Sequence, residues 1–217
     1  GTTPDHIKAM ADACRMIPIK PVEKKNFTMV SSYGQSVFLG TGSKIIGERI
    51  NPTGKKRFKQ ALKEHDLDYI LREGITQQDN GAHIQDVNVG LPDIDEPALM
   101  KEVVQELQSV TSLPLQIDTV DVEAMEGALR IYNGKAMVNS VSGKQESMDK
   151  VFPLIQKYGG VVIGLALDEN GIPADAEGRV QVAKKIIADE LEPDSILQVD
   201  YDKDFVVNVI YNTVTEE

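Results

Sequence analysis

Three stretches of this chain decide its fold, and they are IQDVN (84–88), LQID (115–118) and AMVN (136–139). Each is a strand-like segment that closes on a single polar residue, which is Asn88, Asp118 or Asn139. A short loop and a helix-like stretch follow each of them. Because the carboxyl ends of the strands in a parallel β/α barrel meet at one face, we expect these three side chains to converge on one ligand.

The same alternation of strand and helix extends in both directions from these stretches. Further strands are expected at 44–50, 160–168 and 195–202, and their Val- and Ile-rich sequences are typical of strands buried on both faces of a parallel sheet. We therefore predict an α/β protein of the (β/α)8 barrel type. It is incomplete, with about six β/α units, since 217 residues fall short of the roughly 250 that such a barrel usually needs.

The two ends of the chain differ from the β/α portion, which we place at residues 44–188. Residues 1–43 predict one helix, with Thr2 or Thr3 as its cap, and then an extended connection. Residues 189–217 contain FVVNVIYNTV (205–214), whose alternation indicates an atypical C-terminal strand or hairpin.

Composition narrows the classes of function. No apolar run approaches the roughly 18 residues of a membrane span, and no signal peptide opens the chain, so we expect no membrane partner. The single Cys14 excludes an internal disulfide and a cysteine-cluster metal site, which favours a reducing, cytoplasmic setting. The absence of Trp argues against a stacking platform for single-stranded nucleic acid.

Charge is distributed unevenly along the chain. Residues 1–63 carry 12 Lys and Arg against 4 Asp and Glu, a balance of +8, whereas residues 64–217 carry 11 against 30, a balance of −19. The basic part could attract phosphate or another polyanion. A solvated linker packed against an acidic domain explains the pattern equally well.

Asp118 is the leading candidate for ligand binding. A carboxylate at the end of a barrel strand can accept two parallel hydrogen bonds from a planar group with adjacent N–H donors, such as an aminopyrimidinone edge. It could instead cap the following helix, although Thr119 and Asp121 could do this as well. Asn88 and Asn139 can read a heterocycle edge without adding charge, or they could simply close Asx turns.

Other polar residues have weaker claims. Asp86 lies two residues before Asn88 and is a further acid for the same face, unless it is a buried structural partner. Glu48 and Arg49 end the first barrel strand and could pair with neighbours. The segment SVSG (140–143) could present backbone N–H groups to an anion at a helix start. The three histidines have no metal-ligand spacing, so we expect no metal bound by this chain.

Five stretches of the chain together carry a family resemblance. They are IGERINPTGKKRF (46–58), DNGAHIQDVNVG (79–90), LPLQIDTVDVEAMEGAL (113–129), KAMVNSVSG (135–143) and YGGVVIGLALDENGIP (158–173). These stretches are similar to the pterin-binding domain of cobalamin-dependent methionine synthase and to the methyltetrahydrofolate:corrinoid methyltransferases. The resemblance runs from about Lys44 to Ile187, and the opening GTTPDHIKAM (1–10) resembles the end of a homocysteine-binding module followed by a linker.

This resemblance implies a (β/α)8 barrel that holds 5-methyltetrahydrofolate and passes its methyl group to a corrinoid cobalt. The cobalamin would sit on a partner domain or protein, and a homocysteine-binding module would lie upstream. Asn88, Asp118 and Asn139 would line the pterin site, with Asp200 as a fourth member. The family also places an asparagine on its seventh strand, and nothing after Asp200 matches that motif.

Three hypotheses follow. The first is the pterin-binding part of a methionine-synthase-like methyltransferase. The second is a truncated barrel that binds pterin weakly, or only folds, without turnover. The third is a transferase like dihydropteroate synthase, which would require a lysine and an arginine at strand ends.

An open parallel sheet also leaves strand edges exposed, which favours a homo-oligomer.

Overall fold

The computed structural model describes residues 1–19, 27–188 and 196–198. Its main sheet has six strands in sequential order, and every neighbouring pair is parallel. This confirms the predicted α/β barrel-type fold with six units. The strands are β3 (Ile46–Ile50), β4 (Ile84–Val87), β5 (Leu115–Asp118), β6 (Met137–Ser142), β7 (Val161–Leu165) and β8 (Ile196–Gln198).

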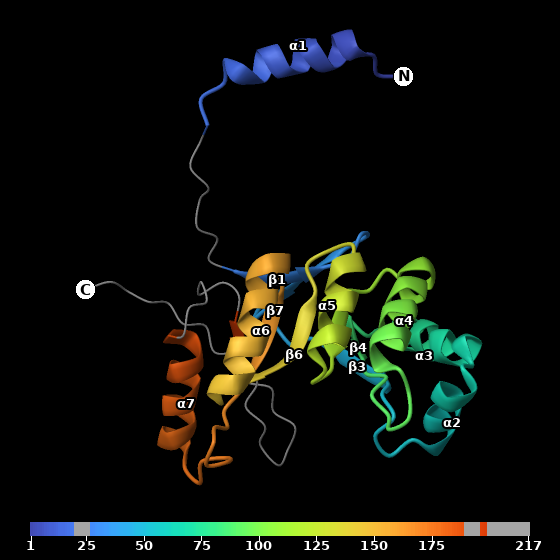
Figure 1. The fold of residues 1–217 in the computed structure, drawn as a ribbon, viewed down its shortest axis with the longest axis vertical. Coiled ribbons are helices and arrows are strands. Elements are labelled where there is room, and N and C mark those ends of the chain that lie inside the picture. The colour runs from blue at the N-terminus through green and yellow to red at the C-terminus, as the bar shows by residue number, and fades with distance from the viewer. Residues whose placement is uncertain (20–26, 189–195, 199–217) are drawn as a thin grey trace.

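Six helices connect these strands and cover one face of the sheet (Figure 1). None of the described helices is long and apolar enough to cross a membrane. The helices are α2 (Lys56–Glu64), α3 (Leu67–Asp79), α4 (Glu96–Val110), α5 (Val122–Ile131), α6 (Gln145–Tyr158) and α7 (Ala176–Ala188).

Aspartate caps set the starts of three of these helices. Asp66, Asp95 and Asp121 each accept a hydrogen bond from a backbone N–H in the first turn of α3, α4 and α5. Such a cap stabilises a helix by about 1 kcal/mol. Helix α6 ends at Gly159, which adopts a left-handed conformation with φ 73°. A glycine adopts this conformation at little energetic cost.

Side chains alternate between the two faces of the sheet. Val87, Ile117 and Val138 point toward the helices and belong to the main hydrophobic core. The next residues along β4 and β5 point to the opposite, inner face of the barrel. On that inner face, apolar side chains come from Ile84 on β4, Met137 on β6, and Val161 and Ile163 on β7. Polar side chains lie level with them in register, with Asp86 and Gln116 beside Met137, and Asp118 and Asn139 beside Ile163.

The segment before the barrel differs in part from the prediction. The expected helix is α1 (Pro4–Arg15), and Thr3 caps it. The expected extended connection instead contains a hairpin, with strands β1 (Thr28–Ser31) and β2 (Ser36–Leu39). Each strand has only four residues, so its alternation is too short to stand out in the sequence. The apolar side of the hairpin packs under the inner face of the sheet through Val30, Val37 and Leu39.

The tyrosine hydroxyl of Tyr132, which follows α5, fixes this hairpin to the sheet. It donates a hydrogen bond of 2.9 Å to the carbonyl oxygen of Ser31 and accepts one of 3.0 Å from the backbone N–H of Leu115. Burial raises the pKa of Tyr132 to about 12. The predicted terminal segment after Gln198, with Asp200, lies outside the described residues.

Candidate functional site

Asp118 ends β5, and its carboxylate is not used as a helix cap. Asp121 caps α5 instead, and its Oδ1 accepts from the N–H groups of Glu123 and Ala124 at 2.9 Å each. The hydroxyl of Thr119 accepts from the N–H of Asp121. The capping alternative is therefore wrong for Asp118, and its carboxylate faces the inner side of the sheet.

Two amide side chains hold this carboxylate in place. Asn88 Nδ2 donates to Asp118 Oδ2 at 2.9 Å, and Asn51 Nδ2 approaches the same oxygen at 3.5 Å. The Oδ1 of Asn88 accepts from the N–H of Gly90, so Asn88 closes an Asx turn and contacts Asp118 at the same time. Both amides use one oxygen of Asp118. The other oxygen, Oδ1, receives no N–H donor from the described residues.

Asn51 is a member of this group that the sequence analysis missed. It follows β3 directly, is 5% exposed, and accepts from the N–H of Thr53 through its own side-chain oxygen. In the sequence it stands before Pro52 and Gly54, so it indicated only a turn. A signal was nonetheless present, because Asn51 ends a strand just as Asn88, Asp118 and Asn139 do.

Asn139 lies directly beside Asp118 on the next strand. The two residues are register partners in the β5–β6 pair, and the carbonyl of Asn139 accepts from the N–H of Thr119 at 3.2 Å. Its side-chain amide is half-buried and forms no hydrogen bond within the described part of the chain. We refer below to Asn51, Asn88, Asp118 and Asn139 as the carboxyl-end cluster.

Asp86 lies beneath this cluster. It is 2% exposed and pairs in register with Gln116, whose Nε2 donates to Asp86 Oδ1. Burial, the charge of Asp118 and the charge of Glu48 raise the pKa of Asp86 from 3.8 to about 7, although the amides of Gln116 and Asn51 oppose the shift. Burial also raises the pKa of Asp118, and the hydrogen bond from Asn88 works against it.

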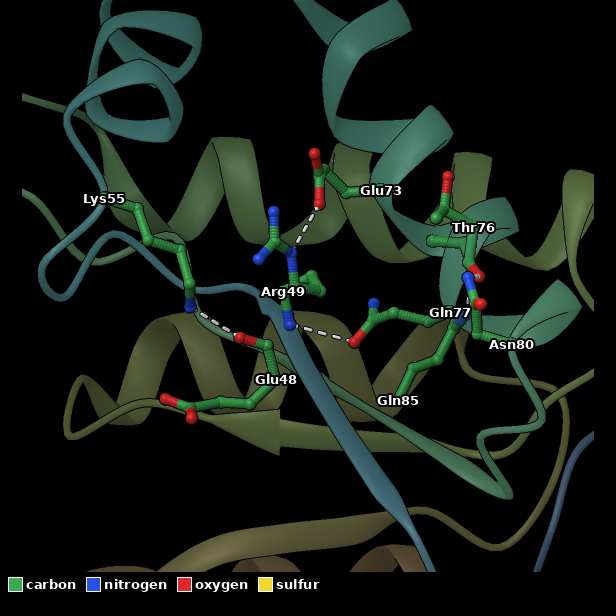
Figure 2. Close-up of polar contacts among 9 residues, drawn as sticks. Glu48, Arg49, Lys55, Glu73, Thr76, Gln77, Asn80 and Gln85 are labelled. Atoms are coloured by element: carbon green, nitrogen blue, oxygen red, sulfur yellow. Dashed lines mark hydrogen bonds and ion pairs between the residues drawn. The ribbon is translucent and has the colours of Figure 1, made fainter.

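The side chains around Arg49 lie on the face of β3 that α3 covers, opposite the inner face of the sheet (Figure 2). Arg49 Nε donates to Glu73 at 2.9 Å, and the backbone N–H of Arg49 donates to Gln77. Glu48 points away from this group, while its carbonyl accepts from Lys55 Nζ at 2.6 Å. The structural reading of Arg49 is therefore confirmed, and its guanidinium is directed away from the carboxyl-end cluster.

Two of the backbone N–H groups expected to face an anion at residues 140–143 donate within the chain. The N–H of Ser142 donates to Ser147 Oγ at 3.0 Å, and the N–H of Gly143 donates to the carbonyl of Leu167 at 2.8 Å. Lys144 provides no side-chain cap for α6, and the N–H of Gln145 donates instead to Glu169 at 2.8 Å. Lys185 Nζ lies 3.7 Å from the same carboxylate group. The hypothesis that SVSG presents free N–H groups to an external anion is not supported, because Ser142 and Gly143 donate within the chain and Glu169 caps the start of α6.

The histidines have local roles. His83 Nδ1 accepts from the N–H of Ile45 at 3.0 Å. His65 ends α2 and lies 3.0 Å from Glu102. Within the described ranges, no three His, Cys, Asp or Glu side chains are arranged to hold a metal ion.

In chemical terms, the carboxyl-end cluster joins one carboxylate with three amides from four successive strand ends. The carboxylate offers to a ligand's N–H donors an oxygen that no N–H group of the described residues occupies, and the amide of Asn139 offers both a donor and an acceptor. Such a set suits a flat, neutral heterocycle whose edge carries adjacent N–H groups. It brings together Asn88, Asp118 and Asn139, as predicted, with Asp86 behind them.

Comparison with known proteins agrees with this geometry. Residues 47–198 match the family model described as pterin binding enzyme. Methionine synthase of Mycobacterium tuberculosis (strain ATCC 25618 / H37Rv) is 29% identical over 201 residues, which are 87% of this chain and 16% of that protein. Methionine synthase of Mycobacterium leprae (strain TN) is 28% identical over 206 residues, which are 87% of this chain and 17% of that protein.

Solved structures with a similar fold include a dihydropteroate synthase of Xanthomonas albilineans. It is 18% identical, with a TM-score of 0.61, and the match covers 81% of this chain and 65% of that one. The chain spans about a sixth of the length of the methionine synthases it matches. The family model covers well over half of the 217 residues, including five strands that were predicted from the sequence. This chain therefore belongs to the family of pterin binding enzymes.

Proposed function

We propose that this chain is the pterin-binding part of a methyltransferase that moves the methyl group of 5-methyltetrahydrofolate to a corrinoid cobalt, in methionine synthesis or related one-carbon metabolism. One observation carries the proposal: Asp118 is held by two amides and keeps one oxygen that no N–H group of the described residues contacts. Asn88, Asp118 and Asn139 would read the pterin edge. Asp86 would support them from below, and Asp200 stays a prediction.

The partners in this proposal come from the resemblance and from the methionine synthase relatives. The cobalamin would be carried by a separate corrinoid-binding domain or protein, and a homocysteine-binding module would adjoin α1. This helix has no buried residue, and Ile7 and Met10 are more than half exposed. The lone thiol, Cys14, is free and exposed, which fits a reducing, cytoplasmic compartment.

A titration with 5-methyltetrahydrofolate tests the site. We expect saturable binding that Asp118→Ala weakens about 10- to 100-fold, because hydrogen bonds to a charged group contribute about 1.5–3 kcal/mol. Isothermal calorimetry measures both dissociation constants. The matched control is Asp121→Ser, which removes a carboxylate three positions away but retains a cap for α5. Equal affinities of the wild type and Asp118→Ala would sink the assignment.

Catalysis needs a separate measurement, because binding alone does not separate a methyltransferase from a barrel fragment. In a single-turnover reaction, the chain is mixed with 5-methyltetrahydrofolate and free cob(I)alamin, and the cobalt spectrum is followed. We expect transfer to be absent or very slow, since nothing in the sequence matches the seventh-strand asparagine of the family. Fast transfer would show that expectation to be wrong and establish the enzymatic reading.

The dihydropteroate-synthase-like alternative makes a different prediction. It requires a dihydropterin pyrophosphate and 4-aminobenzoic acid to be joined, with release of pyrophosphate. Of the two basic residues beside β3, Arg49 is paired with Glu73 and Lys55 with a backbone carbonyl. We therefore expect no pyrophosphate release above background, as measured by a coupled phosphate assay. Steady release would favour this alternative.

A further inference from the structure

Acids and amides alternate on the inner face of β4 and β5. Along β4, Asp86 precedes Asn88, and along β5, Gln116 precedes Asp118. Asp86 faces Gln116 across the strands, and Asn88 faces Asp118, so each acid has an amide opposite it. The two acids lie on the diagonal of this four-residue group. Diagonal neighbours on adjacent strands are close enough for their side chains to interact.

The negative charge of this group is not balanced by a cation within the described part of the chain. The groups that act most strongly on Asp86 are Glu48 on β3, the Asn51 amide, and Gln116 and Asp118 on β5, and none of them is basic. Asp118 also faces Glu96 from α4. The described residues form no metal-binding cluster either. A buried and a half-buried carboxylate beside one another, without a cation, disfavour the doubly ionised state.

A buried hydrogen-bond acceptor beside Asp86 indicates which of the two acids carries a proton. Gln116 is 4% exposed, and its Oε1 has no hydrogen-bond partner, although its Nε2 donates to Asp86. A buried acceptor without a donor is costly and rare. An ionised Asp86 cannot supply a donor, because a carboxylate only accepts. A protonated Asp86 can donate its O–H to Gln116 Oε1, or to Asp118, which lies within hydrogen-bonding reach.

We propose that Asp86 is a neutral carboxylic acid in the ligand-free protein, and that it acts as a positioning residue which keeps Asp118 ionised and aimed at the ligand. The Asp86 proton removes the repulsion between the two acids and gives a donor to the acceptors around it. Asp118 then presents its carboxylate to N–H donors. The second half of this inference rests on the proposed pterin-binding function, whereas the protonation of Asp86 does not.

The raised pKa of Asp86, about 7, agrees with this geometry. A ligand that covers the carboxyl-end cluster would remove water from the pair and would favour the neutral form of Asp86 further. By linkage, the ligand then binds more tightly to the protonated protein. Affinity should therefore fall several-fold as the pH rises through about 7.

The first experiment measures the proton without any ligand. The full chain is labelled with aspartate carrying carbon-13 at the carboxyl group, and the carboxyl resonances are followed by NMR from about pH 4.5 to about pH 9. We expect one resonance with a midpoint near 7 that is missing from Asp86→Asn. In Asp118→Asn the same midpoint should move down, because a neighbouring negative charge has been removed. A midpoint below about 5 for the Asp86 resonance would overturn the proposal.

Two further variants keep the test decisive. If Asp86→Asn does not fold, Glu48→Gln removes a second negative charge that raises the pKa of Asp86, so the midpoint of Asp86 should fall. An unchanged midpoint in both Glu48→Gln and Asp118→Asn would refute the arrangement. Asp68→Asn, which removes a carboxylate from the exposed surface of α3, is the matched control and should leave the midpoint in place.

The second experiment measures the positioning role. The dissociation constant for 5-methyltetrahydrofolate is determined from about pH 6 to about pH 8.5 in the wild type and in Asp86→Asn. We expect the affinity of the wild type to fall several-fold with rising pH and that of Asp86→Asn to stay flat. Identical pH profiles would overturn the positioning role. If the wild type binds no pterin, the proposed function fails, while the carboxyl titration still decides the protonation of Asp86.

Discussion

Among individual residues, the decisive contrast is between Asp118 and Asp121, which stand three positions apart and carry the same charge. Asp121 caps α5 and so satisfies backbone N–H groups. This leaves Asp118, which is held by Asn88 and Asn51, available to a ligand. A local sequence pattern cannot separate these two roles, because either residue could cap the helix. The structure separates them through partners that lie 30 and 67 positions away.

Asp86 also makes the stability of the protein depend on pH. Its pKa is raised from 3.8 to about 7 in the folded chain, so the folded state holds more protons than the unfolded state between these values. The free energy of unfolding should therefore fall as the pH rises from about 4 to about 7, and level off above that. In Asp86→Asn this decline should be smaller, and the variant should gain stability relative to the wild type above pH 7.

Urea unfolding at several pH values in this range measures the effect. Asp68→Asn serves as the control and should keep the wild-type slope, because it removes an exposed acid from α3. A wild-type decline that persists unchanged in Asp86→Asn would show that other carboxyl groups cause it. Stability that rises from pH 4 to pH 7 in the wild type would contradict the sign derived above.

At the level of elements, the hairpin depends on contacts that are distant in sequence. Tyr132 joins Ser31 of β1 to Leu115 of β5 through one buried hydroxyl. We expect Tyr132→Phe to destabilise the protein by about 1–3 kcal/mol, because it leaves a buried N–H and a buried carbonyl without their partner. Urea denaturation measures this change. Tyr158→Phe is the control, since that hydroxyl contacts Glu126 at the surface and should matter less.

The strands and helices of the barrel could be predicted because their signals are local. Buried strands such as 161–165 are runs of Val and Ile, and helices such as α5 begin at a capping residue. Asn51 carried a local signal that was missed, whereas the hairpin and the cap supplied by Glu169 could not be predicted in this way. Each depends on a partner from another unit, as when Glu169 accepts from Gln145, 24 positions away. Sequence spacing alone does not show which distant groups meet.

At the scale of the whole molecule, the described sheet is open and has two edge strands. Among the described strands, β3 and β8 each have a single neighbour, whereas a closed barrel would pair its first strand with its last. Strand edges carry backbone groups that can pair with another chain. An apolar residue, Ile45, immediately precedes β3 and is 56% exposed. The association of two copies stays a prediction, and this part of the sheet is where we expect it to occur.

Light scattering after size-exclusion chromatography tests this association. We expect a molar mass above the 23.8 kDa of one chain at high concentration, and a fall toward 23.8 kDa on dilution. Ile45→Lys should shift the balance toward single chains, because a lysine beside an edge strand opposes pairing with another edge. Ile172→Lys is the matched control, since Ile172 is 72% exposed in the loop before α7 and lies outside β3 and β8. A mass of 23.8 kDa at every concentration would mean that the β3 edge is protected within a single chain.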